Sequence, residues 1–100
     1  MSIAQIVRDR KGKAGKSRAW RVMTIHNGDI PLYELWHYGT LMLRWSDTYV
    51  EYMDTGHGSV SDQNGMNIAF SVLHVPYYYS RAGGPEIKLL DAPLFKYRRS

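Results

Sequence analysis

The stretch that decides the fold is residues 56–67, which read Gly-His-Gly-Ser-Val-Ser-Asp-Gln-Asn-Gly-Met-Asn. Glycines, small hydroxyls and amides crowd into this segment, and an apolar helical pattern begins at its end. A loop of this composition that leads into a helix gathers backbone N–H groups at the positive end of the helix dipole. Such a point suits either a bound anion or a buried polar network. We therefore interpret this segment as the start of the main helix and as the candidate site.

The helix itself is predicted from its periodicity. Apolar residues recur at i, i+3, i+4 and i+7 from Met66 to Leu73, which places them on one helical face. Ser61 is the predicted N-cap, and Pro76 ends the helix. Gly65 costs a helix about 1 kcal/mol relative to alanine, so we expect another group to approach the backbone closely at that position.

Before this helix, short connections separate four predicted strands, over residues 20–26, 32–38, 40–45 and 48–53. Such connections force antiparallel neighbours, because a parallel pair needs a crossover of about a dozen residues. A final hairpin is predicted from residues 77–80 and 86–90, which flank a turn-rich segment. The expected fold class is therefore α+β, an antiparallel β-sheet meander of about five strands packed on one main α-helix.

The length of 100 residues and the hydrophobic share of 44% fit one domain with a single core. We expect a basic N-terminal arm over 1–18 that includes a short helix, a single α+β domain over 19–92 and a basic C-terminal tail over 93–100. The absence of cysteine excludes disulfides and thiolate metal sites. No apolar run approaches the roughly 18 residues of a membrane helix, so we predict a cytoplasmic protein.

Positive charge is concentrated at the two ends of the chain, and the body between them is acidic. Basic ends of this kind are typical of nucleic-acid binding, because neutralised phosphates release their counterions. A merely solubilising segment has the same composition, so both interpretations stay open. The candidate nucleic-acid residues are Arg8, Arg10, Lys11, Lys13, Lys16, Arg18, Arg98 and Arg99.

The polar side chains at the predicted helix start form the candidate site: His57, Gly58, Ser59, Ser61, Asp62, Asn64 and Asn67. In a structural interpretation, Ser61 caps the helix while Asn64 and Asn67 bond to neighbouring strand ends. In a binding interpretation, the same groups hold an anion or the backbone of a partner. Both interpretations remain open from the sequence.

An enzymatic interpretation would use His57 as general base and Ser59 or Ser61 as nucleophile, with Asp62 orienting the imidazole. No nucleophile elbow accompanies these residues, so we predict that the protein is not an enzyme and assign no catalytic residue. The four histidines lie on separate predicted elements and no cysteine accompanies them. We therefore predict neither a metal site nor a cofactor.

The segment 56–67, preceded by Tyr38-Gly39-Thr40 at a strand start, also carries a family resemblance. It resembles a pattern in small uncharacterised proteins of phages that infect actinobacteria, and the similarity covers residues 33–75. The resemblance implies a phage-encoded protein that acts in the cytoplasm of a bacterial host. The resemblance also implies a partner, because small accessory products of this kind often bind a host protein or nucleic acid.

Aromatic residues make up 13% of the chain. One helix cannot cover a sheet of this size, so a tryptophan left on the uncovered face would mark a contact surface. Of the tyrosines at 77–79, at most two can share one face of a strand. We favour a small non-enzymatic accessory protein that binds a host protein through an aromatic sheet face or the helix-start loop, with a homodimer as another way to bury that face. The alternative is a nucleic-acid-binding module that uses the basic ends.

Overall fold

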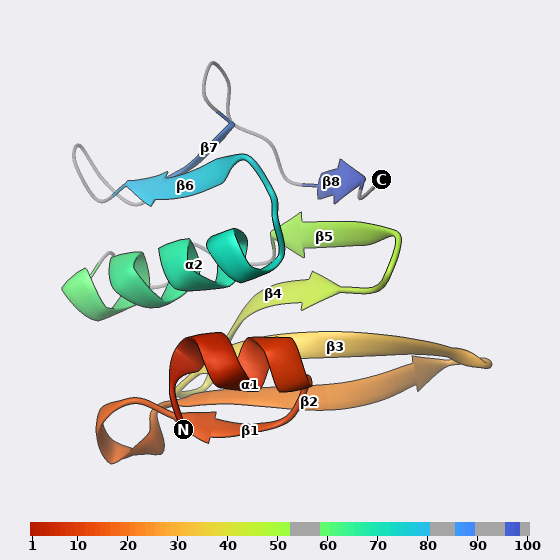
Figure 1. Cartoon of the computed structure of the whole chain (residues 1–100), viewed down its shortest axis with the longest axis horizontal. Helices are drawn as coiled ribbons and strands as arrows, with labels where there is room; N and C mark the ends of the chain where they lie inside the picture. The colour runs from red at the N-terminus through yellow and green to blue at the C-terminus, as the bar shows by residue number, and fades with distance from the viewer. Residues whose placement is uncertain (53–58, 81–85, 90–95, 99–100) are drawn as a thin grey trace.

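The computed structural model describes residues 1–52, 59–80, 86–89 and 96–98, and its architecture is α+β (Figure 1). The helices are α1 (Ile3–Asp9) and α2 (Val60–Val72), with a short 3-10 turn η1 (Lys16–Arg18). The strands are β1 (Gly12–Ala14), β2 (Trp20–Asn27), β3 (Ile30–His37), β4 (Thr40–Trp45), β5 (Tyr49–Tyr52), β6 (Tyr77–Ser80), β7 (Glu86–Leu89) and β8 (Lys96–Arg98).

Six strands form one antiparallel sheet in the order β1-β2-β3-β4-β5-β8. Strands β2 to β5 follow one another as neighbours, so the predicted meander and the α+β class are confirmed. Strands β6 and β7 pair with each other in a separate sheet, as the predicted final hairpin requires. Strands β1 and β8 were not predicted, since three residues are too few for an alternating pattern to stand out.

Both helices pack on one face of the six-stranded sheet and share a single hydrophobic core with it (Figure 1). Side chains alternate between the two faces, so Val22 and Leu35 are buried beneath the helices while Arg21 and Trp36 point the other way. No helix within the described residues covers that second face, which we call the open face. The fully buried core side chains include Ile6, Trp20, Leu35, Leu43, Trp45, Val50, Met66 and Phe70.

The N-terminal segment predicted as a basic arm contains a helix that packs on the rest of the chain. The Ser2 hydroxyl caps α1 by accepting a hydrogen bond from the Gln5 N–H at 3.1 Å. Ile6 and Val7 of this helix are buried in the common core, and α1 contacts both α2 and β1. The basic side chains around α1 are therefore mounted on a folded surface.

Helix α2 begins two residues earlier than Ser61 would place it. Ser59 is the N-cap: its hydroxyl accepts from the Asp62 N–H at 3.0 Å, and Asp62 Oδ2 accepts from the Ser59 N–H at 3.2 Å. This reciprocal capping box satisfies two helix-end donors at once, so it prevails over a cap at Ser61. The prediction of Ser61 as N-cap was therefore wrong.

The far end of α2 is closed by a Schellman motif ahead of Pro76. His74 adopts the left-handed conformation with φ of 57°, and its N–H donates to the Ser71 carbonyl at 3.2 Å. The Val75 N–H donates to the Phe70 carbonyl at 3.1 Å. These two bonds satisfy carbonyls that would otherwise be left without a donor at the helix end.

Gly65 explains how closely α2 approaches the sheet. A methyl group built on this glycine would overlap with carbon atoms of the Trp20 ring. The expected close approach at this position is thus an aromatic side chain of β2, and the helix backbone lies directly against it. Any larger residue would push α2 away from the sheet.

Replacing Gly65 with alanine is predicted to destabilise the protein by about 2 kcal/mol, because the overlap with Trp20 outweighs the gain in helix propensity. Gly39→Ala is the matched control, since nothing lies within 4 Å of a methyl group at that turn position. Urea unfolding followed by tryptophan fluorescence gives both free energies. A Gly65→Ala variant as stable as Gly39→Ala would contradict this packing.

Candidate functional site

The start of α2 is joined to β3 by a buried pair of polar side chains. Asp62 Oδ1 lies 2.6 Å from Nδ1 of His37, and the two residues are only 2% and 6% exposed. An ionised carboxylate can only accept, so the proton between these atoms belongs to Nδ1 of His37. The Ser61 hydroxyl lies 3.3 Å from Nε2 on the other side of the ring, which can accept from it in the tautomer that carries its proton on Nδ1.

The ring of His37 is fixed by stacking as well as by hydrogen bonds. It lies parallel to the ring of Trp20, with 4.0 Å between the centroids and 6° between the planes. Gly65 of α2 abuts the same tryptophan. Ser61, His37 and Asp62 therefore form a line of hydrogen-bonded groups whose central ring cannot rotate without breaking the packing.

Asn67 ties α2 to the separate β6–β7 hairpin. Its side-chain oxygen accepts from the Tyr79 N–H at 2.6 Å, and its amide nitrogen donates to the Tyr79 carbonyl at 3.1 Å. Tyr79 itself is buried against the core. The amide thus satisfies two backbone groups of β6 and fixes the hairpin beside the helix.

The predicted site residues divide into three groups. Ser59, Asp62 and Asn67 bond to the protein's own backbone or side chains, in agreement with the structural interpretation. Ser61 and Asn64 are exposed. His57 and Gly58 lie outside the described residues, so their predicted role stays a prediction.

Sequence reasoning missed His37, which turns out to be the central residue of this network. A signal was present: His37 follows Leu35 with the spacing of two that marks the inward face of a strand. A polar residue at an inward position needs a buried partner. Asp62, the acid in the first turn of the predicted helix, was the available one.

A hollow of about 400 Å³ opens beside the start of α2. It is within the size range of small-ligand sites. Its exposed wall is Tyr38, which is 66% exposed and has a left-handed φ of 53°. Strained backbone of this kind in a non-glycine residue concentrates at functional sites. The lining residues are Ile3, Gly15, Ala19, Trp20, Tyr38, Val60, Ser61 and Asn64.

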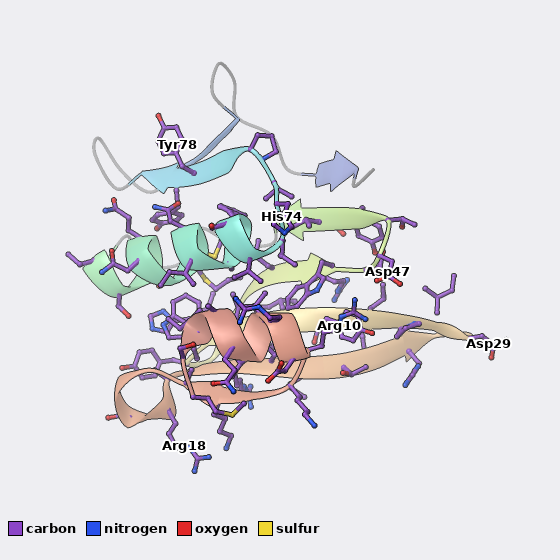
Figure 2. The ribbon with its side chains drawn as sticks, viewed as in Figure 1. Arg10, Arg18, Asp29, Asp47, His74 and Tyr78 are labelled. Carbon is purple, nitrogen blue, oxygen red and sulfur yellow. The ribbon has the colours of Figure 1, made fainter. Side chains whose placement is uncertain are left out.

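A second hollow of about 590 Å³ lies where the C-terminal ends of α1 and α2 meet, between Arg8, Arg10 and His74. Arg10 is already engaged there, since its guanidinium donates to Asp47 at 3.2 Å and to the Tyr33 hydroxyl at 3.1 Å (Figure 2). Asp47 thus neutralises the positive charge of Arg10 at the edge of this hollow.

The predicted nucleic-acid residues do not gather on one described surface. Arg8, Arg10, Lys11, Lys13 and Arg18 are exposed around α1 and β1. The backbone of Lys16 lies in η1, and that of Arg98 lies in β8 at the opposite edge of the sheet from β1. Arg99 is outside the described residues. Strand order therefore separates the two basic ends.

The open face of the sheet carries a row of interlocked polar and aromatic side chains. Arg44 donates twice to Glu34 Oε2, at 2.9 and 3.2 Å, and Trp36 Nε1 donates to Glu34 Oε1 at 3.2 Å. The Arg21 guanidinium lies over the Trp36 ring, 5.2 Å from its centroid. Its buried Nε has no hydrogen-bond partner among the described residues. Met23, two residues after Arg21 on β2, lies on the same face and is 42% exposed.

The three tryptophans therefore have different environments. Trp20 and Trp45 are buried beneath the helices, whereas Trp36 is only half-buried on the open face. On β6, Tyr79 is buried in the core. Tyr78 is exposed (Figure 2). These two tyrosines cannot form one stacking platform, as the alternation of strand side chains predicts.

No family model, curated protein or solved structure that was compared with this chain gives a significant match. Within the described residues, neither helix has the length and apolar character that crossing a bilayer requires. The same part of the chain brings together no group of three or more side chains suited to a metal ion. Function must therefore be argued from the geometry alone.

Asn67→Ala is predicted to destabilise the protein by about 2 kcal/mol, because it leaves a buried N–H and a carbonyl of Tyr79 without their partner. Asn64→Ala, three residues earlier on the exposed side of the same helix, is predicted to change stability by less than about 0.5 kcal/mol. Thermal and urea unfolding of both variants supply the comparison. Equal losses would show that Asn67 does not hold the hairpin.

Proposed function

We propose that this protein is a binding module that takes a partner protein on its open sheet face. The observation that supports this most directly is Trp36, a half-buried tryptophan on a face that no described helix covers. The Arg21 guanidinium lies over its ring. Met23 is exposed and, because it alternates with the buried Val22 on β2, it lies on the same open face. Tryptophan, methionine and arginine are the residue types most enriched in protein interfaces.

The charges on this face indicate the chemistry of the partner. The guanidinium of Arg21 makes no hydrogen bond to a described side chain, and Lys13 stands opposite it across the β1–β2 pair. Arg44 is already neutralised by Glu34. Among the cations on strands β1 to β4, the unneutralised positive charge therefore lies at the β1 side of the face, and it favours a partner with an apolar patch flanked by an acidic group.

A protein fits this face better than a single-stranded nucleic acid does. A base needs an open aromatic ring for stacking, but the Arg21 guanidinium already occupies one side of the Trp36 ring. Glu51 also lies on this face, and its carboxylate would repel phosphates. The resemblance to phage proteins suggests that the partner is a protein of the bacterial host, met in its cytoplasm.

The experiment captures partners from an actinobacterial lysate on the tagged full-length protein and quantifies them by mass spectrometry. Met23→Glu is predicted to lower the capture of the specific partner at least about tenfold, because it replaces an exposed apolar side chain of the proposed contact surface by a carboxylate that repels the acidic group of the partner. Ile68→Glu is the matched control: Ile68 is 39% exposed, close to the 42% of Met23, but lies on α2. Arg21→Gln is predicted to weaken the same partner by removing the positive charge that faces its acidic group.

Equal capture by wild type and by Met23→Glu would contradict the proposal. A second outcome is that wild type captures no host protein but forms a concentration-dependent dimer that Met23→Glu abolishes. The partner on the open face would then be a second copy of this chain. Retention of nucleic acid that falls steeply with salt would favour the alternative, a module that uses the basic surface. That alternative is tested by substituting the exposed Lys11, Lys13 and Arg18 with glutamine, since deleting residues 8–18 would remove β1 and part of α1.

A further inference from the structure

We infer that Ser61 is a serine nucleophile for acyl transfer, activated by His37 and served by the hollow beside it. This activity is independent of the open face and goes beyond the binding function proposed above. It rests on three features of the start of α2: the order of the hydrogen-bonded groups, the free backbone donors next to the hydroxyl, and the apolar space in front of it.

The order of the groups is the one that activates a serine. The carboxylate of Asp62 holds Nδ1 of His37 at 2.6 Å, which fixes the ring and its tautomer. The opposite nitrogen, Nε2, is thereby left to accept the proton of the Ser61 hydroxyl, 3.3 Å away. Distances of this length are usual before a substrate is bound. Serine, histidine and aspartate in these roles are recognised by geometry, whatever their order in the chain.

The two residues that would activate Ser61 are themselves held in place. Asp62 is held by the capping box with Ser59, and His37 is held by its parallel stacking on Trp20. Ser61, by contrast, is exposed. The groups that orient the base are buried and rigid, while the group that would react faces solvent.

Two backbone donors are available for the oxyanion of the reaction. The N–H groups of Val60 and Ser61 open the 13-residue helix α2, and no described residue accepts from them. The N–H of Asp62 already donates to the Ser59 hydroxyl, and the N–H of Gln63 donates to the Ser59 carbonyl. The first two N–H groups therefore point out of the helix start, where the helix dipole also favours negative charge.

The hollow in front of Ser61 defines the substrate class. Its volume is about 400 Å³, and apolar side chains of Ile3, Ala19, Trp20 and Val60 line it. No charged side chain is among its lining residues. This lining suits an ester or thioester with a short, uncharged acyl group.

The reaction balances with water as the only co-reactant. Ser61 Oγ attacks the acyl carbon and its proton passes to Nε2 of His37. The bond to the leaving alcohol or thiol breaks, that group takes the proton, and the acyl group stays on Ser61. Water then attacks the acyl carbon, gives a proton to His37 and releases the acid, and the proton returns to Ser61.

The test uses a short alkyl fluorophosphonate on the full-length protein, with the modified residue mapped by mass spectrometry. Ser61 is predicted to react at least about tenfold faster than the exposed serines Ser2 and Ser17, which have no described histidine beside them and serve as internal controls. The same protein is predicted to release one equivalent of p-nitrophenol rapidly from p-nitrophenyl acetate, as the acyl group is retained on Ser61.

Two variants separate chemistry from folding. Ser61→Ala removes only an exposed hydroxyl and is predicted to abolish the labelling at this site without changing the circular dichroism spectrum. Asp62→Asn is predicted to slow labelling of Ser61 at least about tenfold, compared at equal folded fraction, because an amide no longer holds the required tautomer of His37. Labelling spread evenly over all serines, or an Asp62→Asn rate equal to that of wild type, would overturn the inference.

Discussion

One buried carboxylate fixes the start of helix α2 to the sheet. Asp62 accepts from the Ser59 N–H with one oxygen and contacts His37 of β3 with the other, so the same side chain caps the helix and docks it. Removing a charged group at this depth from its partners costs about 3–5 kcal/mol, which makes the pair the dominant polar constraint of the fold. Gly65 and the stacked ring of Trp20 then set the distance between helix and sheet.

The two surfaces of interest follow from this constraint. Because α2 is held with its first turn over His37, Ser61 is directed to the outside and into the hollow bounded by Trp20 and Tyr38. Because both helices pack on the same face, Arg21 and Trp36 remain on the open face, where no described helix covers them. The proposed reactive hydroxyl and the proposed binding surface thus occupy different parts of the small domain.

The sequence predicted those features that depend on neighbouring residues. Turn-forming residues and alternating apolar and polar side chains predicted strands β2 to β5 and the β6–β7 hairpin. The helical spacing of apolar residues predicted α2. Sequence reasoning missed one local pattern, since Ser59 and Asp62 have the spacing of a capping box. It failed where distant residues decide, because the buried partner of Asp62 is His37, 25 residues away along the chain. The close contact of Gly65 was expected from its helix cost, but its partner, Trp20, is set by tertiary packing. That Trp36 alone among the tryptophans would face away from the helices required knowledge of the strand register.

The central claim is that the Asp62–His37 contact holds α2 to the sheet, and a double-mutant cycle measures it most directly. His37→Phe keeps an aromatic ring against Trp20, and Asp62→Asn keeps a side chain that can cap, so the cycle isolates the contact between the two residues. Urea unfolding of both single variants and of the double variant is predicted to give a coupling free energy of about 2 kcal/mol. Losses that add to within about 0.3 kcal/mol would contradict the account, because they would show that the two residues stabilise the fold independently.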